Sequence, residues 1–161
     1  MTVQTYSRLE LAQNQLEAAI GLFVSGGDRF STISLAGAAD VILSRLLITR
    51  GIQNFTELSM QIERDRGDDP GSREVHGKII NDTLFINHLK HMDDSDDGFV
   101  EMDPEECALA AILKALANFV SLAGKQHNFV QAFMAWIRLN LDPTKYNIYG
   151  DPHWEPHGNE A

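Results

Sequence analysis

Residues 28–51, DRFSTISLAGAADVILSRLLITRG, contain the pattern that decides the fold. Their apolar side chains recur with a period of about 3.6 residues, which is the period of one face of an α-helix. Asp28 precedes the first apolar residue as an N-cap does, and Gly51 follows the last one, where a C-terminal cap belongs. The small residues at positions 36–39 predict close contact with another helix. We therefore predict a central helix over this segment.

Capped apolar segments flank this helix on both sides. Ser7 and Glu10 have the spacing of a capping box, in which each side chain binds a backbone N–H group of the other residue. Asp103 before Pro104 is the strongest start signal, because proline suits the first helical position and aspartate accepts hydrogen bonds from free N–H groups. The further helices are expected to cover about residues 7–25, 54–66, 72–92, 103–123 and 126–140.

Length and periodicity together indicate the fold class. The chain has 161 residues, of which 43% are hydrophobic, and this suits one domain with its own core. No segment alternates apolar and polar residues over six or more positions, so no β-sheet is predicted. We expect an all-α, up-and-down helical bundle of four main helices plus one or two accessory helices. Residues 1–144 are expected to form the bundle domain, and residues 145–161 an extended tail with aromatic and proline residues.

The negative charge of the chain is concentrated in one short segment. The net charge is −10, and residues 93–106 hold eight acidic side chains and no lysine or arginine. The rest of the chain carries a net charge of only −2. Because no basic stripe is present, strong non-specific binding to nucleic-acid backbones is not expected.

Cysteine content and hydropathy bear on the cellular compartment. Cys107 is the single cysteine, so it forms no disulfide within the chain, and its neighbours indicate a helix thiol rather than a nucleophile. The N-terminus has no signal-peptide pattern, and no stretch reaches the roughly 18 to 20 apolar residues that cross a bilayer. We predict a cytoplasmic protein that does not bind a membrane.

The segment Ile86-Asn87-His88-Leu89-Lys90-His91 is expected to end the helix over residues 72–92. Together with Leu35-Ala36-Gly37-Ala38-Ala39-Asp40 and the acidic start at residues 103–106, it resembles the HEPN-type helical bundle over roughly residues 9–119. Active members of that family are metal-independent RNases, or partners of nucleotidyltransferases, with a motif of arginine, a polar residue, several further residues and histidine. Asn87 matches the polar position and His91 the histidine, whereas Ile86 occupies the position of the arginine.

The resemblance implies two functions. Without the arginine, no cation stabilises the charge that develops on a phosphate, so we expect a non-catalytic interaction or regulatory module. Such a module would bind a nucleotide, RNA or a partner protein near Asn87 and His91, and the resemblance also implies a homodimer. Residues 36–39 and the aromatic tail are the expected subunit faces. The alternative is a metal-independent endoribonuclease in which His91 is the acid or base and Asn87 and Lys90 assist. No cofactor is expected in either case.

The acidic segment after His91 gives a third hypothesis, a cation-binding module. Asp93, Ser95 and Asp97, followed by Gly98, reproduce the first half of an EF-hand loop, and Glu101 takes the ninth position. The twelfth position should be a bidentate glutamate, but the chain has Pro104 there and Glu105 one residue late. His88 and His91 with Asp93 or Asp94 form a second, weaker combination for a metal. Against a metal site, acidic connections between bundle helices are common without any metal, and Asp103-Pro104 is already explained as a helix start.

One inward-facing acid in the central helix also needs a partner. Asp40 lies among small and apolar residues, and a buried carboxylate is costly unless a cation pairs with it. We expect an arginine such as Arg45 to be that cation.

Overall fold

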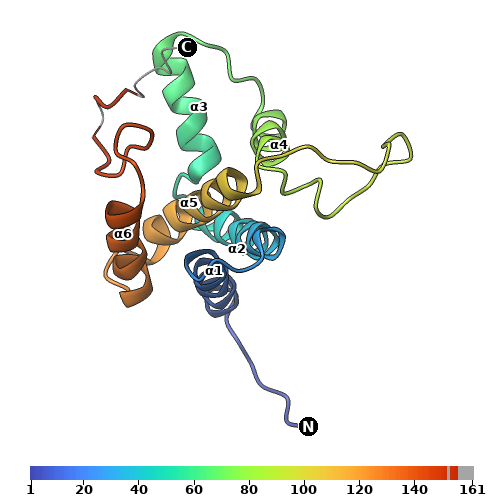
Figure 1. Ribbon diagram of the computed structural model, residues 1–161, viewed down its shortest axis with the longest axis vertical. Helices are drawn as coiled ribbons and strands as arrows, with labels where there is room; N and C mark the ends of the chain where they lie inside the picture. Colours follow the sequence, from blue (N-terminus) through green and yellow to red (C-terminus); the bar gives the residue numbers. More distant parts are fainter. Residues whose placement is uncertain (152, 156–161) are drawn as a thin grey trace. The chain divides into compact units, whose positions relative to one another are not determined.

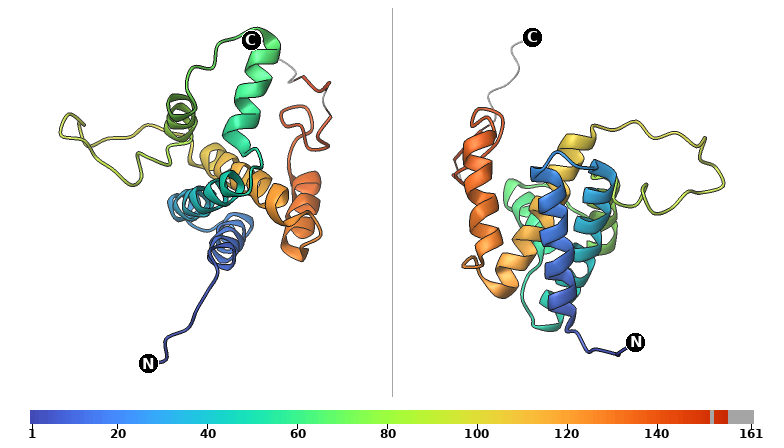
Figure 2. Two further views of the ribbon diagram at one scale, coloured as in Figure 1. Left: turned by 180° about the vertical axis from the view of Figure 1, so that it is seen from behind. Right: turned by 60° about the horizontal axis from the view of Figure 1, so that its bottom comes forward.

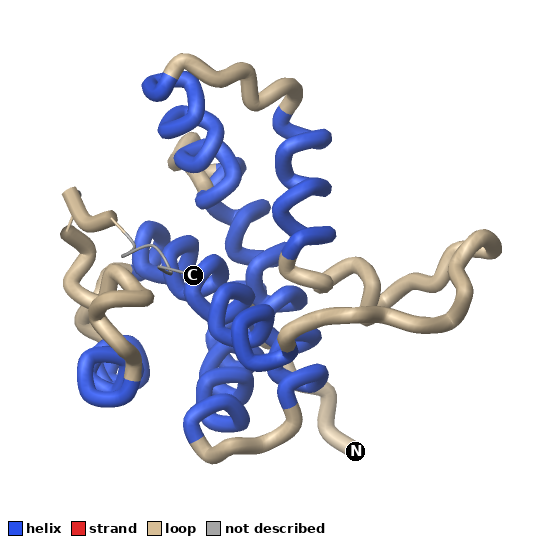
Figure 3. The backbone as a smooth tube through the Cα atoms, turned by 45° about the horizontal axis from the view of Figure 1, so that its top comes forward, coloured by secondary structure: helices blue, strands red, loops and turns tan. Residues whose placement is uncertain are grey.

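The computed structural model describes residues 1–151 and 153–155. Helices are the regular elements of this part of the chain, which contains no strand (Figures 1 and 3). The all-α prediction is therefore confirmed, whereas the up-and-down order of the helices stays a prediction. The helices are α1 (Arg8–Val24), α2 (Arg29–Thr49), α3 (Phe55–Arg66), α4 (Arg73–Thr83), α5 (Pro104–Ala123) and α6 (Asn128–Asn140).

The chain divides into two compact units, residues 1–124 and residues 125–161. The first unit holds α1 to α5. The second holds α6 and the tail, in which the indole nitrogen Nε1 of Trp154 donates to the carbonyl of Pro143 at 3.0 Å. This bond returns the end of the described tail to the residues that follow α6. The domain boundary that we expect from the sequence, at residue 144, stays a prediction.

Within the first unit, α2 packs against both α1 and α5, and these three helices form the core (Figures 1 and 2). Apolar residues that the helical period places on one face meet there. Helices α3 and α4 pair with each other, and the buried His76 of α4 lies 3.1 Å from the hydroxyl of Ser59 of α3. The largest fully buried apolar side chains of this unit are those of Leu16, Ile33, Leu43, Leu47, Ile112 and Phe119.

The predicted caps begin their helices as expected. At α1 the Ser7 hydroxyl accepts from the Glu10 backbone at 3.1 Å, and the Glu10 carboxylate accepts from the Ser7 backbone at 2.7 Å. At α5 the Asp103 carboxylate accepts from two backbone N–H groups, and Pro104 takes the first helical position. These local bonds satisfy donors that a helix start otherwise leaves free. They explain why the sequence predicts helix starts well.

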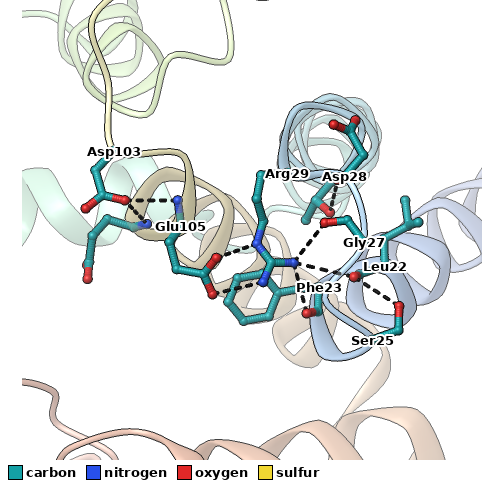
Figure 4. A network of polar contacts seen from close by, with 10 residues as sticks. Leu22, Phe23, Ser25, Gly27, Asp28, Arg29, Asp103 and Glu105 are labelled. Carbon is teal, nitrogen blue, oxygen red and sulfur yellow. Dashed lines mark hydrogen bonds and ion pairs between the residues drawn. The ribbon is translucent and has the colours of Figure 1, made fainter.

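Arg29 joins the turn between α1 and α2 to the start of α5 (Figure 4). Its guanidinium group binds both carboxylate oxygens of Glu105, with an Nη2–Oε1 distance of 3.0 Å. The same group donates to the carbonyl of Phe23 at 3.0 Å and lies over the Phe23 ring, 4.5 Å from its centroid. One side chain therefore satisfies carbonyls at the end of α1 and fixes the first turn of α5 beside them.

Helix α4 ends earlier than the sequence predicts. It ends at Thr83 rather than near Met92, and turns occupy residues 84–90. Phe85 has a left-handed φ of +57°, and the backbone N–H of Ile86 donates to the carbonyl of Asn81 at 3.0 Å. This reversal directs the Ile86 side chain into the core, where only 2% of it is exposed. Residues 87–91 therefore form a turn after the buried Ile86, and they are not the last part of α4.

The small residues of α2 make room for the Ile86 side chain. A Cβ atom added to Gly37 would lie 2.6 Å from Cγ2 of Ile86, which is closer than real side chains approach. Ala36 and Ala39 are fully buried in the bundle as well. The close contact predicted for these residues exists, but its partner at Gly37 is the turn after α4 and not a helix. These small residues are buried inside the bundle, so our expectation that they form a subunit face is not supported.

Helices α2 and α5 are long and apolar enough to cross a membrane by length and composition alone. About half of the most apolar 18-residue stretch of each helix is buried in the fold, 44% in α2 and 56% in α5. Core helices of soluble proteins pass the same test, so it does not determine where the protein resides. The cytoplasmic location stays a prediction.

Candidate functional site

Asn87 organises the turn that carries the predicted motif. Its amide nitrogen Nδ2 donates to the carboxylate of Asp82 at 2.7 Å. Its backbone carbonyl accepts from the backbone N–H groups of Lys90 and His91, each at 3.0 Å. The side-chain amide nitrogen and the backbone carbonyl of Asn87 thus both hold the turn, which is a structural role.

The structure brings Asn87 and His91 together but leaves Lys90 apart. Asn87, His88 and His91 line an open pocket of about 580 Å³, whose other lining residues are Lys78, Asp82, Asp93 and Asp96. Lys90 is exposed and does not line this pocket. Among the described lining residues, Lys78 carries the only permanent positive charge, against three carboxylates. The local charge is therefore negative, which disfavours a phosphate group there.

The position that the HEPN-type motif gives to arginine lies inside the protein. Ile86 is buried against Gly37, so its side chain does not face the pocket that His91 lines. An RNase of this type needs a cation beside the scissile phosphate. The nuclease alternative therefore gains no support from the arrangement of Asn87, Lys90 and His91, and it stays a prediction.

Residues 92–103 form an extended segment between the turn and α5, which we call the acidic arm (Figure 1). It carries six carboxylates and no lysine or arginine. Three of its apolar side chains are exposed, Met92 by 71%, Phe99 by 84% and Val100 by 49%. They line a pocket of about 350 Å³ together with Phe85, His88 and His91. The arm thus combines apolar side chains in contact with water and a dense negative charge.

Carboxylates of the acidic arm bind the arm's own backbone. The backbone N–H of Asp93 donates to the Asp96 carboxylate at 2.9 Å, and that of Phe99 donates to the Asp97 carboxylate at 3.0 Å. Gly98 has a φ of +83°, as the sharp turn of an EF-hand loop requires. In the described part of the chain, no three or more histidine, cysteine, aspartate or glutamate residues are placed to hold a metal ion. Cation binding by the weak candidates Asp93, Ser95, Asp97 and Glu101 stays a prediction.

A buried charged network lies between α2 and α5. The Lys114 ammonium group binds the Asp40 carboxylate, and 4% or less of either residue is exposed. The Lys114 ammonium also donates to Asn81 of α4 at 3.1 Å. The partner of Asp40 is thus Lys114, 74 positions away, and our expectation of Arg45 is wrong. An inward lysine in an apolar helix face was the signal in the sequence that would have indicated this pair.

Asn118 completes the network one turn further along α5. Its amide nitrogen donates to the second Asp40 oxygen at 2.6 Å and to the Ser44 hydroxyl at 3.1 Å. Its amide oxygen accepts from the backbone N–H of Phe55, at the start of α3, at 2.7 Å. Every hydrogen-bonding atom of this side chain is used, which is what a buried amide requires. The network therefore ties α2, α3, α4 and α5 to one another.

A cleft opens above this network. It has a volume of about 330 Å³ and is bounded by α2, α4, α5 and the first residues of α3. Clefts in which a few polar and charged groups converge are the usual candidates for ligand-binding sites. The charged residues that line the cleft are Asp40, Arg45, Arg73, Glu74, Lys78 and Lys114.

Cys107 of α5 is buried, with 8% of it exposed, as the sequence indicates for a structural thiol. Burial raises the pKa of this thiol, and the carboxylates of Asp103 and Glu106 raise it further. At neutral pH the reactive thiolate is therefore rarer than for free cysteine. We expect iodoacetamide to alkylate Cys107 at least about tenfold more slowly than the denatured chain near pH 8, as measured by mass spectrometry. Equal rates would contradict this assignment.

Comparisons of the chain with protein-family models, with curated proteins and with solved structures gave no match. The HEPN-like resemblance therefore stays a prediction from the sequence.

Proposed function

We propose that the protein is a non-catalytic interaction module that binds a partner protein through the acidic arm. The partner has a basic, partly apolar segment, because that chemistry complements exposed apolar side chains among carboxylates. This role is the one that the HEPN-like resemblance predicts for a chain without the motif arginine. The turn with Asn87 and His91 lies at the base of the binding surface.

The exposure of Phe99 is the observation that carries this proposal. Its ring is 84% exposed, and the neighbouring Met92 and Val100 are exposed too. Large aromatic and methionine side chains are typical anchors of interfaces, and their exposure to water is unfavourable in an isolated protein. A partner that covers these side chains removes apolar surface from water, which favours binding. The surrounding carboxylates favour a positively charged partner.

The charge of the arm argues against RNA as the partner at this surface. Six carboxylates repel a phosphate backbone, and Lys78 is the single lysine or arginine that lines either described pocket beside His91. RNA or nucleotide binding at Asn87 and His91 is accordingly the weaker form of the sequence hypothesis.

A fluorescent amphipathic peptide rich in lysine and leucine tests the proposal. We expect fluorescence anisotropy to show saturable binding to the full chain, weakening as salt is added, and none for the same peptide with glutamate in place of lysine. A single-stranded RNA oligonucleotide should not bind. Phe99→Ser should weaken peptide binding at least about tenfold, because it removes the central apolar anchor. Light scattering of the free protein measures the predicted homodimer in the same preparation.

Matched variants separate the arm from the rest of the surface. Phe30→Ser removes a ring on α2 that is 50% exposed, and Asp68→Asn removes an exposed carboxylate from another loop. Neither should change the affinity. The double variant Asp96→Asn/Asp97→Asn keeps amide oxygens for the backbone bonds of the arm while removing two charges, so it should weaken binding mainly at low salt. Unchanged affinity in Phe99→Ser, or equal loss in Phe30→Ser, would refute the proposal.

A further inference from the structure

The cleft above the Asp40–Lys114 pair is positively charged within a strongly acidic protein. Four of its lining residues are cationic and two are anionic, while the chain as a whole carries a charge of −10. The Asp40 carboxylate forms an ion pair with Lys114 and accepts a hydrogen bond from the Asn118 amide, so the Asp40–Lys114 pair adds no net charge to the cleft. Arg45 and Lys78 have no ion-pair or hydrogen-bonding partner for their charged groups in the described chain. Two free cations, from α2 and α4, thus line the same small cleft.

We propose that this cleft binds the phosphate group of a small phosphate monoester. Such a group carries a charge of about −1.5 to −2 near pH 7 and several acceptor oxygens, which suits cations approaching from two helices better than a single carboxylate does. The volume of about 330 Å³ is at the lower end for small-molecule sites, so it suits a compact ligand rather than a polymer.

The floor and one wall of the cleft suit the same ligand. Lys114 is 96% buried, and two of its three ammonium hydrogens go to Asp40 and Asn81, so a third donor is left where the residue lines the cleft. Asn54 and Thr56, at the start of α3, line the cleft too.

Two further charged side chains, those of Arg73 and Glu74, affect how strongly the cleft attracts an anion. Arg73 lines the cleft but already binds the Glu57 carboxylate at 3.0 Å, so its contribution is partly neutralised. Glu74, the next residue of α4, is exposed and opposes an anion. The site therefore depends on Arg45 and Lys78, and the removal of the Glu74 charge should strengthen it.

Calorimetric titration of the full chain in a phosphate-free buffer tests this proposal. The probes are ribose 5-phosphate, inorganic phosphate and ribose. We expect saturable heat with ribose 5-phosphate and none with ribose. Arg45→Gln and Lys78→Gln should each weaken binding about tenfold to a hundredfold, as expected for the loss of a charge-assisted hydrogen bond. Glu74→Gln should tighten it by a few fold. If inorganic phosphate and ribose 5-phosphate bind with equal affinity, the cleft recognises the phosphate group alone. If ribose 5-phosphate binds more tightly, the cleft also contacts the sugar.

Arg8→Gln is the matched control, because Arg8 is an exposed arginine at the start of α1 and does not line the cleft. It should leave the affinity unchanged. Absence of heat with ribose 5-phosphate overturns the proposal, as does a loss in Arg8→Gln equal to that in Arg45→Gln, which would indicate general charge attraction. Arg45 does not line the pocket beside the acidic arm, so Arg45→Gln should leave binding of the basic peptide unchanged. The two proposals thus fail separately.

Discussion

Ile86→Arg is expected to lower the free energy of unfolding by about 3–5 kcal/mol, and not to produce a nuclease. The substitution restores the arginine of the HEPN-type motif in the sequence. In the structure it places a charge where only 2% of the Ile86 side chain is exposed and where Gly37 leaves no room for a longer one. Urea denaturation followed by circular dichroism measures the loss.

Arginine substitutions on the exposed face of α4 are the control. Val75 and Ile79 are each 55% exposed, so Val75→Arg and Ile79→Arg should change the free energy of unfolding by no more than about 0.5 kcal/mol. If Ile86→Arg keeps the stability of the unaltered protein and cleaves RNA, the buried position of Ile86 is wrong and the missing arginine alone is what keeps the unaltered chain from acting as a nuclease.

Lys114→Met is expected to cost about 3–5 kcal/mol of stability, because it leaves the Asp40 carboxylate buried without its cation. Methionine is unbranched like lysine and only one heavy atom shorter, so lost volume contributes little to the expected effect. Total stabilities of domains are about 5–15 kcal/mol, and the change should therefore be plain in urea denaturation. A loss below about 1 kcal/mol would contradict the buried ion pair.

The double variant Asp40→Leu/Lys114→Met separates charge burial from packing. Removing both charges at once should recover most of the stability that Lys114→Met loses, since a buried pair contributes little beyond what apolar residues provide. Asn118 keeps its bonds to Ser44 and to the backbone of Phe55 in this variant. If the double variant is as unstable as the single one, the loss reflects packing around α2 and α5 instead of an unpaired carboxylate.

Helix starts were predictable from the sequence because their causes are local. Ser7 with Glu10, and Asp103 with Pro104, act over three residues or fewer, so spacing alone identifies them. The all-α class followed from the same short-range periodicity. The end of α4 was not predictable in this way, because its apolar residues continue the helical period past Thr83 while Ile86 turns toward Gly37, 49 positions earlier.

The candidate sites show the same division between local and distant causes. The sequence singled out Asn87 and His91, and in the structure both line one pocket, but it did not indicate that Ile86 beside them is buried. It also identified Asp40 as an inward acid but named the wrong cation. Lys114 is brought to Asp40 only by the packing of α2 on α5, and no rule of spacing within one helix reports on a neighbouring helix.

The acidic arm is held at both ends by parts of the bundle that do not depend on what lies between them. Ile86 is embedded in the core on one side, and Asp103 caps α5 on the other. The entropic cost of closing a loop rises by only about 0.6 kcal/mol for each doubling of its length. Insertions, deletions and replaced residues between these two anchors therefore cost the bundle little. Recognition can diversify there while the scaffold stays constant, as it does in the hypervariable loops of antibodies.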